Sequence, residues 1–222
     1  MKRGSAALLV MLLLASGCRG TAPTVGALSG VPASVAIPRT QLPAGNQTTV
    51  FRWDFRDRIF GAKGDGVARI AGPDSVRLDF FSDGGEALGF AIVIGDSIYT
   101  PGGDEARRYL PPVPLLWAAF GTLRLIGADT TLRVDGDTLR ADIQSDTLTS
   151  PSSLPANFGR VAFAERNLVR LERVANRRLE EFVERSDSVR VRYRHNSARR
   201  SLGLTIQRQS RGDAFDPAIW QR

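Results

Sequence analysis

Residues 51–80 read FRWDFRDRIFGAKGDGVARIAGPDSVRLDF, and two segments within this stretch alternate between apolar and charged side chains. The first alternating segment spans residues 51–56 and the second spans residues 76–80. A period of two is typical of a β-strand that buries one face and exposes the other. The side chains on the expected buried face are Phe51, Trp53, Phe55, Val76, Leu78 and Phe80.

Further strands are expected at residues 66–71, 86–94 and 97–100. The turns between them are short and rich in glycine, aspartate and proline, as in Gly72-Pro73-Asp74-Ser75 and Asp83-Gly84-Gly85. Turns of this length join antiparallel neighbours, so this part of the chain is predicted to form a meander. In the segment 86–94 large residues alternate with small ones, which indicates a strand that is covered on both faces; the large ones are Leu88, Phe90, Ile92 and Ile94.

Residues 101–127 interrupt this pattern. The polar stretch 102–110 is compatible with one helical turn, and prolines at 111, 112 and 114 open the apolar stretch 115–123, LLWAAFGTL. Proline in the first turn favours a short apolar helix over residues 115–123.

The strand pattern resumes after residue 130. Strands are expected at 131–134, 138–143, 160–165, 168–174, 188–195 and 202–206, whereas residues 178–185 are compatible with either a strand or a helix. The total is about ten or eleven antiparallel strands with one or two short helices, and so wide a sheet either packs as two layers or curls toward a barrel.

The N-terminus has the features of a bacterial export signal. Two basic residues precede an apolar run at 6–15, which is too short to span a bilayer and ends in Ser16-Gly17-Cys18. The sequence around Cys18, the only cysteine, resembles the lipobox of bacterial lipoproteins, in which this cysteine is diacylated on sulfur and becomes the acylated N-terminus. An ordinary signal peptide with an incidental cysteine is the alternative.

The lipobox divides the chain into three parts. Residues 1–17 are predicted to be a removable signal peptide, and residues 18–48 a lipidated cysteine followed by a flexible tether rich in Gly, Pro, Thr, Ala and Ser. Residues 49–222 are predicted to form the folded β domain. Arg19 stands where aspartate would signal retention in the inner membrane, so we expect an envelope protein anchored in the outer membrane and facing the periplasm.

Composition excludes several functional classes. The chain has 222 residues, 42% hydrophobic and 24% charged, which suits a folded domain with a core. One cysteine excludes an intramolecular disulfide and a thiolate metal cage, and one histidine, His195, excludes a multi-histidine site, so no metal and no cofactor are expected. The net charge of +7 includes an arginine excess in residues 160–222, which suits either an anion-facing surface or a solvated sheet face. Nucleic acid is not expected as a partner of an exported protein.

The search for catalytic motifs indicates no enzyme. His195 lies on a predicted strand, and no Gly-x-Ser-x-Gly elbow supplies a nucleophile for it. The glycine-rich segment 61–66 lacks the Gly-Lys-Ser/Thr of a phosphate loop. Carboxylates such as Asp79, Glu86 and Glu180-Glu181 are available, but nothing in the pattern pairs them.

The order of these features resembles the LolA/LolB-type superfamily of periplasmic lipoprotein carriers and related lipid-binding lipoproteins. The resemblance covers Val50–Arg208 and depends on the lipobox, residues 51–55, 64–80 (GDGVARIAGPDSVRLDF), 94–99 and the apolar stretch 115–121. It implies a mainly β fold, a half-open antiparallel barrel of about eleven strands closed by short lid helices around a cavity for acyl chains. The resemblance implies that this cavity is lined on its concave side, and by Trp117 and Phe120 from the lid helix; the residues of the concave side are Phe51, Trp53, Phe55, Val76, Leu78, Phe80, Leu88, Phe90, Ile92 and Ile94.

One feature departs from the pattern of this superfamily. Members that deliver lipoproteins at the outer membrane carry an apolar protrusion between the third and fourth strands. The matching turn here, residues 82–86 (SDGGE), is polar, which argues against delivery through this turn but leaves acyl binding open.

Two hypotheses of different class follow. The first is a monomeric, non-enzymatic carrier or acceptor of the acyl chains of lipids or lipoproteins, anchored in the membrane through Cys18. The second is a structural or interaction lipoprotein of the outer membrane with a packed core and no ligand. A cavity of several hundred Å³ on the concave side would favour the first hypothesis.

Overall fold

In the computed structural model the described residues form one antiparallel sheet of 13 strands. Tight turns join most of the consecutive strands. The structure describes residues 22–125, 130–144 and 158–221. The strands lie in the order β1-β7-β8-β9-β10-β11-β12-β13-β2-β3-β4-β5-β6. Their bounds are β1 Val31–Pro32, β2 Asn46–Arg56, β3 Gly61–Ala71, β4 Ser75–Ser82, β5 Ala87–Ile94, β6 Ser97–Tyr99, β7 Thr130–Asp135, β8 Thr138–Ile143, β9 Phe158–Ala164, β10 Asn167–Ala175, β11 Arg178–Arg185, β12 Arg190–His195 and β13 Arg200–Gly212.

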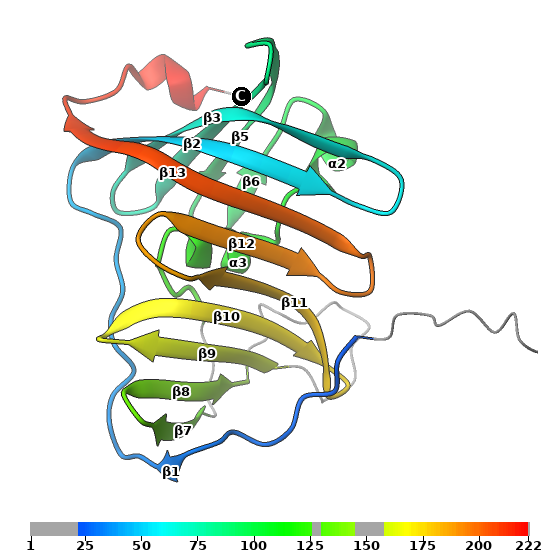
Figure 1. Ribbon diagram of the computed structural model, residues 1–222. Coiled ribbons are helices and arrows are strands. Elements are labelled where there is room, and N and C mark those ends of the chain that lie inside the picture. The colour runs from blue at the N-terminus through cyan, green and yellow to red at the C-terminus, as the bar shows by residue number, and fades with distance from the viewer. Residues whose placement is uncertain (1–21, 126–129, 145–157, 222) are drawn as a thin grey trace, which may run out of the picture.

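The sheet curls around its concave side without closing, because β1 and β6 form its two free edges and do not pair with each other (Figure 1). Both edge strands have three residues or fewer, which leaves little unpaired backbone for edge-to-edge association. The predicted mainly β, half-open barrel is therefore confirmed, with 13 strands where about eleven were expected. The ambiguous segment 178–185 is strand β11, and its residues 181–183 are buried in succession because both of its faces are covered.

Within the described part of the chain two short α-helices, α2 Gly103–Arg107 and α3 Val113–Ala119, connect the halves of the sheet. A 3-10 turn, η2 Pro217–Trp220, follows β13. Helix α3 lies in the concavity against β10, β11 and β12, and five of its seven residues are buried. An isolated helix of this length is unstable in water, so burial of its apolar side chains holds it in place. No helix in the described parts of the chain is long and apolar enough to cross a bilayer.

The pairing of β4 with β5 corrects one prediction about faces. Val76 pairs with Val93 and Leu78 with Ala91, so the small residues of β5 share the buried concave face. Ile92 and Ile94 were expected to face the interior, but they pair with Arg77 and Ser75 and point to the opposite face. The alternation of large and small residues gave the period of this strand correctly, but only the register with β4 decides which set faces inward.

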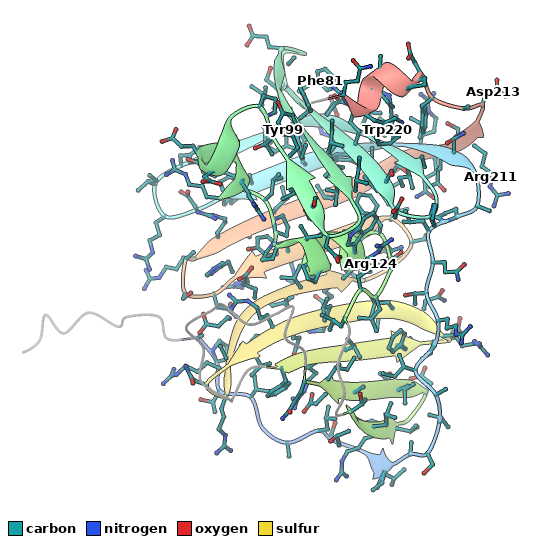
Figure 2. All side chains as sticks on the ribbon, turned by 180° about the vertical axis from the view of Figure 1, so that it is seen from behind. Phe81, Tyr99, Arg124, Arg211, Asp213 and Trp220 are labelled. Atoms are coloured by element: carbon teal, nitrogen blue, oxygen red, sulfur yellow. The ribbon has the colours of Figure 1, made fainter. Side chains whose placement is uncertain are left out.

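The outer side of β4 and β5 is covered in part by the C-terminal segment. Arg77 of β4 donates from Nη1 to the carbonyl oxygen of Ile219 at 2.7 Å. Figure 2 shows the molecule from the side of β5 and β6, with Tyr99 and Trp220 labelled on it. On this side Ile92 lies between Arg77 and Tyr99 in the sheet and is 3% exposed, although it does not belong to the main apolar core.

Residues 22–45 also differ from the expected flexible tether. They run along the sheet: Thr24 bridges to Arg178, and β1 pairs with the edge strand β7. Three apolar side chains of the segment are buried: Ala22, Leu28 and Leu42. The composition suggested a tether because backbone pairing and isolated apolar anchors leave no periodicity in the sequence.

Replacing Leu42 by alanine tests whether this segment belongs to the folded domain. Leu42 is 6% exposed and packs in the main core, so we expect the free energy of unfolding to fall by about 2–4 kcal/mol. Val35 in the same segment is 50% exposed, and Val35→Ala serves as the control with a change within about 0.5 kcal/mol. Equal, negligible changes in urea unfolding for both variants would show that the segment contributes no stability.

Candidate functional site

The concave side of the sheet has a hollow at the end where α2 lies, which we call the α2 pocket. Its volume is about 540 Å³, and it is open on one side. No charged side chain occurs among the described residues that line it. They are Trp53, Phe55, Phe60, Ala62, Phe80, Leu88, Gly89, Phe90, Thr100, Pro101, Gly102, Ala106, Tyr109, Leu110 and Leu202.

Glycines of β3 allow the aromatic rings of β2 to lie over the sheet and form the pocket wall. Trp53 pairs directly with Gly64, where a Cβ would clash with the carbonyl oxygen of Phe81. The indole Nε1 donates to the carbonyl oxygens of Asp65 at 2.9 Å and Phe81 at 3.2 Å. Because its polar atom is satisfied by backbone, Trp53 adds only apolar surface to the pocket.

Three aromatic rings from separate elements close the pocket near α2. The ring centroids of Phe55 and Phe60 lie 5.3 Å apart, and Tyr109 lies edge-on at 5.6 Å from Phe55 and 6.0 Å from Phe60. Leu202 of β13 pairs directly with Phe55 and extends this wall. Apolar side chains from β2, β13, the β2–β3 turn and the segment after α2 thus converge on one hollow.

Exposed apolar side chains border the mouth of the α2 pocket. Ile59 is 90% exposed, Leu88 56% and Phe60 45%, and we call these three residues the apolar rim. The β2–β3 turn holds two of them in place, because the Asp57 carboxylate accepts the backbone N–H groups of Ile59 at 2.8 Å and Phe60 at 2.9 Å. These hydrogen bonds lower the pKa of Asp57, so the turn stays fixed at neutral pH.

Arginines cover the outside of the aromatic wall. Arg108 donates from Nη2 to the Tyr109 hydroxyl at 2.9 Å, and this bond raises the pKa of Arg108. The Arg200 guanidinium lies 5.5 Å from the Tyr109 ring and also donates to the Arg108 carbonyl oxygen. The pocket is therefore apolar inside and flanked by positive charge outside.

Other hollows are less suited to an apolar ligand. A smaller one of about 230 Å³, the α3 pocket, lies between α3 and strands β2, β3 and β13, and the guanidinium of Arg185 borders it. Arg185 donates from Nη1 to the Ala119 carbonyl oxygen at 2.6 Å, and burial lowers its pKa. A hollow of about 720 Å³ is lined largely by the loops 40–45 and 122–125 and includes Asp96 and Arg124.

The residues predicted to line one cavity are divided among three places in the structure. Those that line the α2 pocket are Trp53, Phe55, Phe80, Leu88 and Phe90. Those that line the α3 pocket are Phe51, Leu78 and Phe120. Those that line neither are Val76, Ile92, Ile94 and Trp117. Cys18 lies outside the described residues.

Trp117 in particular fills the concavity. It is 1% exposed, its Nε1 donates to the Gly95 carbonyl oxygen at 2.8 Å, and the Arg124 guanidinium lies 4.5 Å from its ring centroid. The pocket residues that sequence patterns missed are mostly in turns, in α2 or next to it, as with Phe60, Ala106 and Tyr109. One feature of the sequence could have indicated this part of the pocket, namely the adjacent apolar pair Ile59-Phe60 in an otherwise polar turn.

Solved structures of similar fold share little sequence identity with this chain. A LolA superfamily protein from Nitrosomonas europaea aligns with a TM-score of 0.45 and 10% identity, over 82% of this chain and 92% of that one. A domain described as an outer membrane lipoprotein-sorting protein, from Vibrio parahaemolyticus, aligns with a TM-score of 0.47 and 6% identity, over 79% and 89%. A DUF1329 family protein from Desulfovibrio piger aligns with a TM-score of 0.43 and 7% identity, over 80% and 90%.

These structures include the superfamily that the sequence pattern resembles. No family model matches the chain, and no curated protein matches its sequence.

A buried polar cluster lies on β10–β12. The Glu181 carboxylate is 3% exposed, accepts the Tyr193 hydroxyl at 2.8 Å and pairs with Arg173. His195 Nε2 lies 3.6 Å from Glu181, and its Nδ1 accepts the Ala198 N–H at 3.1 Å. The hydrogen bond from Ala198 holds the imidazole against the β12–β13 turn. Among the described residues no group of three or more His, Cys, Asp or Glu side chains is placed to hold a metal ion.

Replacing His195 by glutamine is expected to change how stability depends on pH. Burial lowers the pKa of His195, so the fold favours the neutral imidazole. The free energy of unfolding should be at its full value above about pH 6.5 and fall as the pH drops below it, since the unfolded chain then binds the extra proton.

Urea unfolding of the native chain and His195→Gln at pH 7.5 and pH 5 measures this effect. We expect a smaller loss of stability in the variant, and no other histidine contributes because His195 is the only one. An identical loss of unfolding free energy in both proteins between pH 7.5 and pH 5 would contradict the assignment of this pH dependence to His195.

Proposed function

We propose that this protein is a non-enzymatic lipoprotein that binds an acyl chain of a lipid or lipoprotein in the α2 pocket. The observation that carries the proposal is a hollow of about 540 Å³ walled by aromatic and aliphatic side chains. Small-molecule sites commonly have about 300–1,000 Å³. Each buried methylene contributes about 0.8 kcal/mol, so a long chain gains on the order of 10 kcal/mol before ordering costs.

The proposal includes the location. Cleavage after residue 17 and acylation of Cys18 would anchor the chain in the cell envelope, at the outer membrane and facing the periplasm. Three acyl chains would hold it stably, because a single chain binds a membrane only marginally. The protein would act as a monomer, since its ligand site is built within one chain.

The three tryptophans allow a direct test of where a ligand binds. Trp53 lines the α2 pocket, Trp117 of α3 is buried in the core, and Trp220 lies in the C-terminal segment. A mature chain, residues 18–222, with Cys18→Ser, Trp117→Phe and Trp220→Phe leaves Trp53 as the sole reporter. We expect a brominated fatty acid to quench its fluorescence in a saturable manner that an unlabelled fatty acid reverses.

A matched chain with Trp53→Phe and Trp117→Phe keeps only Trp220 and should show no saturable quenching. Absence of quenching in the folded Trp53 chain would reject the α2 pocket as an acyl site. It would favour the second candidate, a structural lipoprotein, for which the filling of the concavity by α3 is the specific observation.

A further inference from the structure

The mouth of the α2 pocket lies at the same end of the sheet as the start of the described chain. Leu179 donates its N–H to the Pro23 carbonyl oxygen at 2.9 Å, which fixes the N-terminal segment to β11. Asn196 of the next turn donates from Nδ2 to the Leu179 carbonyl oxygen at 2.7 Å. Arg58 of the β2–β3 turn reaches the following residue, donating from Nη2 to the Ser197 carbonyl oxygen at 2.9 Å.

These contacts link two turns, the start of β11 and the N-terminal segment into one end of the molecule, which we call the rim end. In Figure 1 the β2–β3 turn, the β12–β13 turn and residues 22–25 all lie on the right. The β11–β12 turn with Val189 marks the opposite end, since β11 runs away from the rim end over eight residues, about 26 Å.

The short distance to the proposed lipid anchor determines which end of the molecule faces the membrane. Cys18 precedes Ala22 by four residues, which span at most about 14 Å in any conformation. Because residues 22–25 are bonded to β11 at the rim end, an acylated Cys18 holds that end close to the bilayer. A flexible tether of some thirty residues would have imposed no such orientation.

The chemistry of the rim end suits an anionic lipid surface. The apolar rim projects Ile59, Phe60 and Leu88 into solvent, and clustered exposed apolar side chains mark interaction surfaces. The exposed arginines Arg58 and Arg108 lie around it. A basic side chain near an anionic membrane is attracted to it, and an apolar side chain gains by entering the interface.

We propose that the rim end is a membrane-contact surface. The apolar rim enters the interface of an anionic bilayer, Arg58 and Arg108 meet lipid phosphates, and the α2 pocket opens against the lipid. This inference rests on the proposed acylation of Cys18 for its orientation, but not on occupation of the pocket.

The orientation is tested with single probes at the two ends of the molecule. The acylated mature chain is reconstituted in vesicles of phosphatidylglycerol and phosphatidylethanolamine, with an environment-sensitive dye on Ile59→Cys or on Val189→Cys. Val189 is the matched control because it is an exposed aliphatic residue, 41% accessible, at the opposite end. Brominated lipids should quench the dye at position 59 several-fold more than the dye at position 189. Equal quenching, or stronger quenching at 189, would overturn the proposal.

The affinity of the surface is tested without the anchor. The mature chain with Cys18→Ser should bind phosphatidylglycerol vesicles about tenfold more weakly when Ile59→Asp is added and about fivefold more weakly with Arg58→Glu. Val189→Asp should change the affinity less than twofold. Binding unaffected by Ile59→Asp and Arg58→Glu would overturn the proposal. Concentration-dependent dimers that cover the dye at position 59 without vesicles would also overturn it, in favour of a second copy as partner.

The experiments distinguish failure of the membrane-contact proposal from failure of the acyl-binding proposal. Ile59→Asp should keep the Trp53 quenching by brominated fatty acid, because the side chain of Ile59 lies outside the pocket lining. Fatty acid binding without vesicle contact would reject only the membrane surface. Vesicle contact without fatty acid binding would reject only the pocket function.

Discussion

Replacing Ala106 by tryptophan is expected to abolish acyl binding. Ala106 lies on α2 and borders the pocket, so an indole ring at this position occupies space that the ligand needs. Loss of contact with three or four methylenes corresponds to about a 100-fold loss of affinity. Since none of the residues of α2 is buried, we expect stability to change by less than about 1 kcal/mol.

Calorimetric titration with a monomeric fatty acid, alongside urea unfolding, measures both quantities. Ala36→Trp is the matched control, because Ala36 is exposed and borders none of the hollows described above. It should bind as the native chain does. Unchanged affinity of folded Ala106→Trp for the fatty acid would mean that the fatty acid binds outside the α2 pocket.

Replacing Trp117 by alanine is expected to cause the largest loss of stability. Its side chain is 1% exposed in the core, and truncating such a tryptophan costs about 3–5 kcal/mol. This is a large fraction of the roughly 5–15 kcal/mol that holds a typical domain together. Trp117→Phe keeps most of the packing but loses the hydrogen bond to Gly95, so its cost should be smaller.

Trp220→Ala is the control for this series, because Trp220 is only half-buried in the C-terminal segment. Urea midpoints should fall in the order native, Trp220→Ala, Trp117→Phe, Trp117→Ala. A Trp117→Ala protein of native stability that no longer binds fatty acid would contradict this account and restore the lid role expected from the sequence.

The alternation of side chains predicted the architecture well because it reflects local geometry. Strand β2 buries Phe51, Trp53 and Phe55 as their spacing indicates, and α3 forms where prolines precede an apolar stretch. The face of β5 could not be obtained in this way. Its alternation is regular from Phe90 to Ile94, and only the register with β4, which pairs Val76 with Val93, shows that the small residues face inward.

The pocket itself was harder to predict than the sheet. Its wall near α2 is made by Phe60 and Tyr109, which belong to a turn and to the segment after a polar helical turn. Neither segment has a periodic pattern, and only the three-dimensional approach of β2 to α2 brings the two rings together. The packing of residues 22–45 on the sheet was missed for a similar reason, since backbone hydrogen bonds such as that from Val25 to Arg177 depend on no particular side chain.

Native mass spectrometry of the mature chain tests the central claim most directly. The chain, residues 18–222 with Cys18→Ser, is purified from bacteria without detergent, so that any lipid mass is non-covalent. We expect a bound lipid or fatty acid on this chain and on Ala36→Trp, and none on Ala106→Trp. A clean unliganded mass, with no uptake of added fatty acids or phospholipids, would contradict acyl binding in the α2 pocket.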